Sequence, residues 1–204
     1  MKPARRSSRA AGFTLLEVLI ALGLFAILAA NLTVLTRTTQ RGAGQQDELM
    51  RLEVLATQTL DRLVLALMAA RQEAVEPLKQ APLNDSKIKY MISTGIDANG
   101  EVVWGDPESI GLDPDSARVI WRRNPDTEQE LRVVWGDHVA TAPLGEALGN
   151  LKDDNQDGLI DECGLSFHLD DDGRSVVIQL SLARQSQAGN WNRTTTHQRV
   201  AFRN

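Results

Sequence analysis

An apolar stretch near the start of the chain, from Phe13 to about Thr36, restricts the possible folds more than any other part of the sequence. It contains roughly 20 apolar or small residues, which is enough to cross a hydrocarbon layer of about 30 Å as an α-helix. Four basic residues and no acidic residue precede it: Lys2, Arg5, Arg6 and Arg9. Because basic flanks stay in the cytoplasm, we expect the N-terminus to be cytoplasmic and the later residues to lie across the membrane.

A single charged residue, Glu17, lies within this apolar stretch. A carboxylate inside a membrane-spanning helix costs about 2.5–3.5 kcal/mol on insertion scales, so it usually has a partner and a function. An ordinary secretory signal peptide is the alternative, but it has a shorter apolar core and a small-x-small cleavage site. The candidate site near Ala29 and Ala30 is preceded by bulky Ile27 and Leu28, which disfavours that alternative.

The segment Gly12-Phe13-Thr14-Leu15-Leu16-Glu17 resembles the cleavage and methylation segment of type IV prepilins and type II secretion pseudopilins. The resemblance covers about Arg9 to Leu35. It implies that a membrane-embedded prepilin peptidase cuts between Gly12 and Phe13 and methylates the new α-amino group of Phe13. It also implies an inner-membrane assembly platform and a filament whose core is built from the N-terminal helices of pilin or pseudopilin subunits.

The position of Glu17 fits this resemblance physically. After cleavage, Phe13 would carry a positive α-amino group, and neither that charge nor the Glu17 carboxylate is stable alone in an apolar environment. Glu17 of one subunit could therefore neutralise the Phe13 amine of its neighbour and fix the register of assembly. A simpler alternative is that Glu17 caps the amine of its own helix, and the two roles can coexist.

Composition restricts the remaining functions. The 204-residue chain has a formal net charge of −5, and removal of the leader would leave 18 basic and 27 acidic residues, or −9. Such a surface argues against nonspecific binding to nucleic acid. Cys163 is the single cysteine, so no internal disulfide can form.

An amphipathic pattern follows the membrane segment. Gly42 and Gly44 favour a bend, and apolar residues then recur at spacings of three and four: Leu49, Leu52, Ala56, Leu60, Leu63 and Leu67. Pro77 ends any continuation. We therefore expect a leader over residues 1–12, a membrane and assembly helix over 13–36, an amphipathic continuation of the helix over 37–76, and a globular domain over 77–204. A free amphipathic helix lying on a membrane is the alternative, which the mixed charges of the polar face disfavour.

The globular part shows a period of two, which predicts strands. Expected hairpins flank turns at 97–100, 124–126 and 170–173, and a final strand is expected over about 196–202. The predicted fold is α+β: one long N-terminal helix, its first half in the membrane, packed on an antiparallel sheet in a pilin-like arrangement. Among pilin-like proteins, the order of these parts is most similar to the minor pseudopilins of the GspJ type. The first half of the helix contains no proline, and the chain lacks paired cysteines, unlike many major pilins.

A second local motif predicts a calcium loop over residues 153–162. Oxygen-bearing side chains alternate at Asp153, Asn155 and Asp157, Gly158 permits a sharp turn, and Leu159 would offer its carbonyl. The loop departs from an EF-hand because Gly164 occupies the position of the bidentate glutamate. It resembles the compact calcium loops of dockerin-like and thrombospondin-like repeats, with either Asp161 or Glu162 completing the ligand shell. A solvated acidic turn is the alternative interpretation, and Mg²⁺ fits the loop less well than Ca²⁺.

No arrangement of residues predicts catalysis. His138, His168 and His197 are scattered, and none belongs to an HExxH pair or a recognisable nucleophile motif with Cys163. We therefore predict a structural subunit without enzyme activity, a minor one near a filament tip that contacts other subunits or secreted cargo. A major pilin or pseudopilin, and a membrane-tethered calcium-binding domain that never assembles, are the two alternatives.

Overall fold

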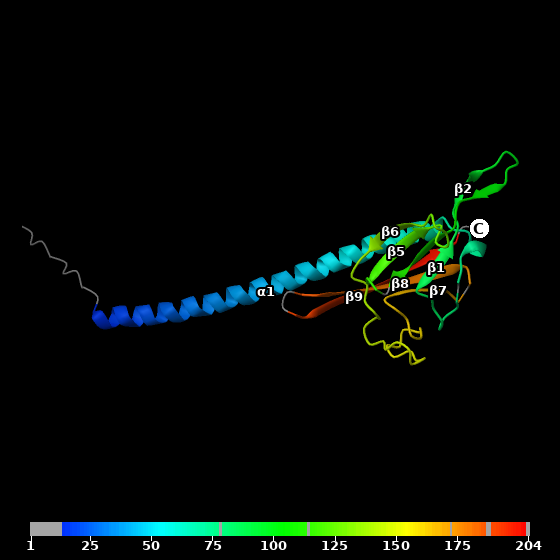
Figure 1. Cartoon of the computed structure of the whole chain (residues 1–204). Helices are drawn as coiled ribbons and strands as arrows, with labels where there is room; N and C mark the ends of the chain where they lie inside the picture. The colour runs from blue at the N-terminus through cyan, green and yellow to red at the C-terminus, as the bar shows by residue number, and fades with distance from the viewer. Residues whose placement is uncertain (1–13, 78, 114, 172, 187–188, 203–204) are drawn as a thin grey trace, which may run out of the picture. The chain divides into compact units, whose positions relative to one another are not determined.

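The computed structural model describes residues 14–77, 79–113, 115–171, 173–186 and 189–202 (Figure 1). The chain divides into two compact units, Met1–Gln46 and Asp47–Asn204. Helix α1 spans Leu15–Met68, and antiparallel strands follow it. The predicted α+β class, with one long N-terminal helix and antiparallel sheets, is confirmed.

The described strands form three groups, each with antiparallel pairing. Their bounds are β1 (Lys87–Tyr90), β2 (Ser93–Ile96), β3 (Val102–Trp104), β4 (Glu108–Asp113), β5 (Arg118–Arg123), β6 (Leu131–Gly136), β7 (Leu165–Leu169), β8 (Ser175–Gln185) and β9 (Trp191–Ala201). One sheet has the order β1-β4-β5-β6, a second is the hairpin β2-β3, and a third has the order β7-β8-β9. A short 3-10 turn, η1 (Gln72–Ala74), lies between α1 and β1.

The amphipathic pattern correctly identifies the face of α1 that is buried in the second unit. Five of its six leucine and alanine positions are in the core, namely Leu52, Ala56, Leu60, Leu63 and Leu67. Leu49, at the start of this unit, is 36 % exposed. The same core contains residues from β1, β4 and β5 and from β7, β8 and β9, so the helix and both larger sheets share one apolar interior.

Helix α1 continues without interruption through Gly42 and Gly44 but ends at Met68, short of the expected end at residue 76. Two bridges explain the early end. Ala70 pairs with Ile92 and Glu76 pairs with Lys89, so the chain after the helix, which includes the turn η1, runs beside β1 and its continuation. Backbone pairing with this edge replaces the helical hydrogen bonds.

Hairpins are present at the three expected turns, although the expected strand over 88–93 is replaced by β1, which pairs with β4, and β2, which forms the first hairpin. One other strand starts earlier than expected, and one strand is not expected. The hairpin β2-β3 turns at 97–100, β5-β6 encloses 124–126, and β7-β8 encloses 170–173. The final strand begins at Trp191, earlier than the expected 196, and pairs with β8 along its whole length. The sequence pattern does not predict strand β4, because its sequence Glu-Ser-Ile-Gly-Leu-Asp carries polar residues that are buried rather than facing solvent.

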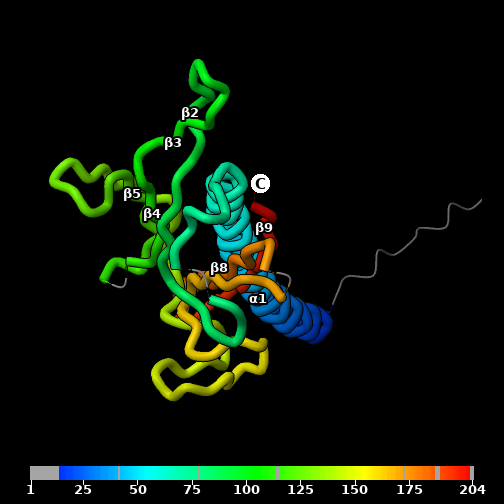
Figure 2. Tube along the Cα trace, turned by 90° about the vertical axis from the view of Figure 1, so that its right-hand side faces the viewer, coloured from blue at the N-terminus to red at the C-terminus, as the bar shows by residue number. Residues whose placement is uncertain are grey.

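Two segments extend from the second unit. Figures 1 and 2 show the hairpin β2-β3 and the irregular segment 137–164, drawn in yellow and orange, extending from opposite sides of the sheets. Segment 137–164 joins β6 to β7 and contains the predicted calcium loop.

Candidate functional site

The start of α1 is a capping box built from Thr14 and Glu17. The Thr14 backbone N–H donates to Glu17 Oε2 at 3.0 Å, and the Glu17 N–H donates to Thr14 Oγ1 at 3.3 Å. The Thr14 hydroxyl also donates to Glu17 Oε2 at 3.1 Å. This reciprocal pattern satisfies N–H groups that the first turn of a helix leaves unpaired. Glu17 thus has a local structural role, which the Thr-x-x-Glu spacing in the sequence could have revealed.

The helix that follows carries an uncovered apolar surface. Every described side chain from Leu15 to Leu35 is exposed in the isolated chain, including Phe25 at 70 %. The hydroxyls of Thr33 and Thr36 donate to the carbonyls of Ala29 and Leu32, both at 2.8 Å, which hides these polar groups along the helix. By length and composition α1 could cross a membrane. A surface of this kind needs lipid or other helices around it.

The predicted processing site lies outside the described residues. Gly12 and Phe13 precede the first described residue, Thr14, so their prediction as the cleavage and methylation site rests on the sequence. Glu17 lies in the first turn of the helix, four residues after Phe13 in the sequence.

The acidic loop lies within segment 137–164, whose two ends are joined to the sheet and to each other. Ala140 N–H donates to Ser181 O at 2.8 Å, and Ser181 N–H donates to Gly164 O at 2.6 Å. Gly164 N–H in turn donates to Thr141 O at 3.2 Å. The far side of the loop is fixed by Ile160 N–H, which donates to Pro82 O at 2.9 Å. These contacts hold the loop against β8 and the segment before β1.

The carboxylates of the loop mostly accept backbone N–H groups. Asp153 accepts from Asp157 and Gly158 at 3.1 and 2.9 Å. Asp161 accepts from Asn150 and Leu151 at 3.0 and 2.9 Å. Such turns fix the backbone of an acidic loop without a regular strand or helix.

Glu146 is a member of this cluster that the sequence motif does not include. Its Oε2 accepts from the N–H groups of Asp154 and Asn155 at 3.1 and 3.3 Å, and its Oε1 accepts from Asp161 N–H at 3.1 Å. No spacing rule links Glu146 to the loop. Only the folded chain brings it there.

Glu162 differs from the other carboxylates because it is fully buried, with 0 % of its surface exposed. Its Oε1 accepts from Asn155 Nδ2 at 2.6 Å, whereas its Oε2 is buried without a hydrogen-bond partner in the described part of the chain. Burial, followed by the charges of Asp157 and Glu146, raises the pKa of Glu162 to about 7. Burial and the neighbouring carboxylates of Glu162 and Asp161 also raise the pKa of the Cys163 thiol.

The predicted metal residues are brought together only in part. Asn155 Nδ2 lies 2.6 Å from Glu162 Oε1 and 3.2 Å from Asp157 Oδ2, and Gln179 Nε2 from β8 donates to the same Asp157 oxygen at 3.0 Å. Within the residues described, no group of three or more His, Cys, Asp or Glu side chains lies in position to hold a metal ion. The contribution of Leu159 and the choice between Asp161 and Glu162 therefore remain predictions.

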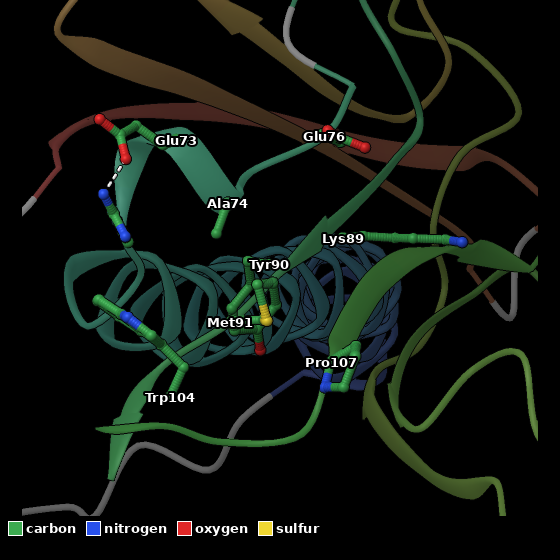
Figure 3. Close-up of a pocket in the computed structure, with 9 residues that line it drawn as sticks. Glu73, Ala74, Glu76, Lys89, Tyr90, Met91, Trp104 and Pro107 are labelled. Atoms are coloured by element: carbon green, nitrogen blue, oxygen red, sulfur yellow. Dashed lines mark ion pairs between the residues drawn. The ribbon is translucent and has the colours of Figure 1, made fainter. Parts of the chain in front are cut away.

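A hollow and three histidines elsewhere in the second unit do not form a recognisable site. A hollow of about 360 Å³ lies beside η1, and Figure 3 shows Tyr90, Met91, Trp104 and Pro107 among the residues that line it. The guanidinium of Arg71 lies 5.4 Å from the ring of Trp104 and is ion-paired with Glu73. The three histidines lie on separate elements: His138 after β6, His168 in β7 and His197 in β9.

Comparison with known proteins identifies one segment. Residues 7–30 match the prokaryotic N-terminal methylation motif, which spans the predicted cleavage site and Glu17. No curated protein and no solved structure matches the chain. The match supports a prepilin-type N-terminus, with processing by prepilin peptidase and assembly with other pilin-type subunits.

Proposed function

We propose that the chain is a minor subunit of a type II secretion pseudopilus or a type IV pilus, most similar to the GspJ type. The observation that carries the proposal is the uncovered apolar helix with one carboxylate in its first turn, whose start lies within a methylation motif. Neighbouring helices in a filament would cover the apolar surface and supply a counter-charge for Glu17. The chain would first be held in the inner membrane with its second unit in the periplasm.

The geometry of Glu17 leaves room for a role between subunits. In the part of the chain that is described, both hydrogen bonds from Thr14 end on Oε2. The other oxygen, Oε1, could therefore accept the methylated amine of Phe13 from an adjacent subunit. The capping role and the pairing role use different oxygens, so one carboxylate serves both.

Two variants separate these roles. Glu17→Gln keeps a side chain that can complete the capping box but removes the charge, whereas Glu17→Ala removes both. Breaking a buried ion pair costs about 3–5 kcal/mol, which corresponds to more than about a hundredfold in an assembly equilibrium. We expect both variants to be cleaved normally and both to be lost from sheared filaments, as quantified by immunoblotting of filament and membrane fractions. Assembly of Glu17→Gln at the wild-type level would contradict the pairing role and leave the cap alone.

Sequencing the N-terminus of the purified protein tests the proposal as a whole. A mature chain that begins with N-methylated phenylalanine at position 13 supports it. A chain that begins near Asn31 indicates a secreted domain, and an intact Met1 indicates a simple membrane anchor. Copy number relative to the main filament subunit distinguishes a minor from a major subunit.

A further inference from the structure

We propose that segment 137–164 binds one Ca²⁺ ion through Asn155, Asp157 and Glu162, with Asp153 and the carbonyl of Leu159 joining them as the side chains rearrange around the ion. The rearrangement is part of the proposal, because no three acidic side chains among the described residues are in position for a metal ion beforehand. Glu162, rather than Asp161, closes the ligand shell. This inference is independent of the filament role, because it concerns a loop of the second unit that has no part in processing or in the membrane helix.

The buried carboxylate of Glu162 is the observation that points to a ligand. Both of its oxygens are removed from solvent, and Oε2 has no hydrogen-bond partner among the described residues. An ionised carboxylate left in this condition is strongly destabilising, so it requires a proton or a cation. The contact between Oε1 and Asn155 Nδ2, at 2.6 Å, directs the carboxylate toward the centre of the loop.

Amide groups occupy the place where a cation would be bound. Asn155 Nδ2 lies between Glu162 Oε1 and Asp157 Oδ2, and Gln179 Nε2 also donates to Asp157 Oδ2. Asn155 Oδ1 accepts the N–H of Asp157 at 3.0 Å. A half-turn of the Asn155 carboxamide exchanges its N–H₂ group for this carbonyl oxygen and breaks that hydrogen bond, which contacts with the ion would have to replace. Oxygen atoms from Asn155, Asp157 and Glu162 would then converge, and a cation between them would replace the N–H donors.

Asp161 has a different role. Its two oxygens accept the N–H groups of Asn150 and Leu151, which lie on the opposite arm of the loop. Glu146 acts similarly toward the backbone of Asp154, Asn155 and Asp161. Asp161 and Glu146 are therefore positioning residues, which hold the backbone so that the other carboxylates face inward.

The ligand set favours calcium. Carboxylate, carboxamide and peptide oxygens are hard ligands, and Ca²⁺ accepts six to eight of them in flexible geometry, with water completing the shell. Mg²⁺ requires a near-ideal octahedron and gives up its water reluctantly. An irregular loop in which one amide must turn before binding suits the more adaptable ion.

Titration calorimetry of the full-length protein in detergent, after dialysis against a chelator, tests the proposal. We expect one Ca²⁺ per chain with a dissociation constant of about 10⁻⁴–10⁻³ M, and binding of Mg²⁺ at least about tenfold weaker. Glu162→Gln should weaken calcium binding at least about tenfold. For comparison, Asp161→Asn keeps one of the two side-chain acceptors and should weaken calcium binding less than Glu162→Gln does.

Circular dichroism will show whether each variant folds. If Glu162→Gln does not fold, Asp157→Asn replaces it and should weaken binding by the same factor. Absence of calcium binding by the wild-type protein at about 5 mM Ca²⁺ would overturn the proposal, since weak extracellular modules bind at or below this range. Unchanged affinity in the Glu162 variant, a large loss in the Asp161 variant alone, or equal affinity for Mg²⁺ would also overturn it.

Discussion

The close packing of the backbone around Gly164 explains why the acidic loop lacks the last glutamate of an EF-hand loop. The twelfth position of that loop type carries a bidentate glutamate. A Cβ atom at Gly164 would lie 1.9 Å from the carbonyl oxygen of Ala140, because the backbone here is hydrogen-bonded between Thr141 and β8. A side chain cannot be accommodated, so a glutamate at this position could not complete the proposed calcium shell, which is why we assign that role to Glu162.

Gly164→Ala should therefore destabilise the protein. The clash involves backbone atoms of Ala140, and relief of such overpacking costs about 1–3 kcal/mol or more. Gly95→Ala in β2 is the matched control, since a Cβ there meets nothing within 4 Å and should change stability by less than about 0.5 kcal/mol. Chemical denaturation followed by circular dichroism measures both. Equal stability of the two variants would mean that the backbone around Ala140 yields easily.

Individual site residues can be predicted from the sequence to different degrees. Glu17 and the alternating oxygens of Asp153, Asn155 and Asp157 are recognisable because their spacing is local. The capping role of Thr14 follows from an equally local spacing, although the structure was needed to identify it. The choice between Asp161 and Glu162 depends on burial and on Asn150 and Leu151, which only the folded loop brings into contact.

In the part of helix α1 that belongs to the second unit, one face is buried and the other is exposed. This difference allows a direct test of how much the buried face stabilises the fold. Leu63 is fully buried, whereas Leu65, two positions later, is 69 % exposed. Leu63→Ala should lower the free energy of unfolding by about 2–5 kcal/mol, and Leu65→Ala should lower it by less than about 0.5 kcal/mol. Thermal or urea unfolding of the two variants measures the difference. Similar losses for both would indicate that the exposed face is covered by a partner in solution.

Local periodicity explains which elements the sequence can reveal. Hairpins with Asp, Asn and Gly at their turns are predictable, since these residues accept positive φ or form side-chain turns. Strand β4 is not, because its buried Glu108 is satisfied by a distant residue: Trp121 Nε1 donates to Glu108 Oε2 at 2.9 Å. The end of α1 at Met68 is likewise determined by pairing with the region of β1, a contact between residues distant in sequence.

For the whole molecule, the two units differ in the surroundings that they require. The first presents apolar side chains along its described helix, whereas the second encloses a common core of helix and sheets. A chain of this kind should remain in the membrane fraction until the first unit is removed.

Cell fractionation tests this expectation. The full-length chain should resist extraction from membranes by alkaline carbonate, because roughly 20 apolar residues hold it there. A fragment that begins at Asp47 should remain in the aqueous fraction, and its cooperative thermal unfolding should show that the second unit folds by itself. Extraction of the full-length chain by carbonate would contradict a membrane-spanning role for its helix. A fragment that aggregates would show that the second unit depends on the first.

The joined ends of segment 137–164 have a practical consequence. Since Thr141 and Gly164 are hydrogen-bonded to each other, the chain leaves the sheet and returns to it at nearly the same place. Extra sequence added at the exposed residue Gly149 need not separate the flanking strands. An epitope or fluorescent label inserted there would report where the protein resides in living cells while both chain termini stay untouched.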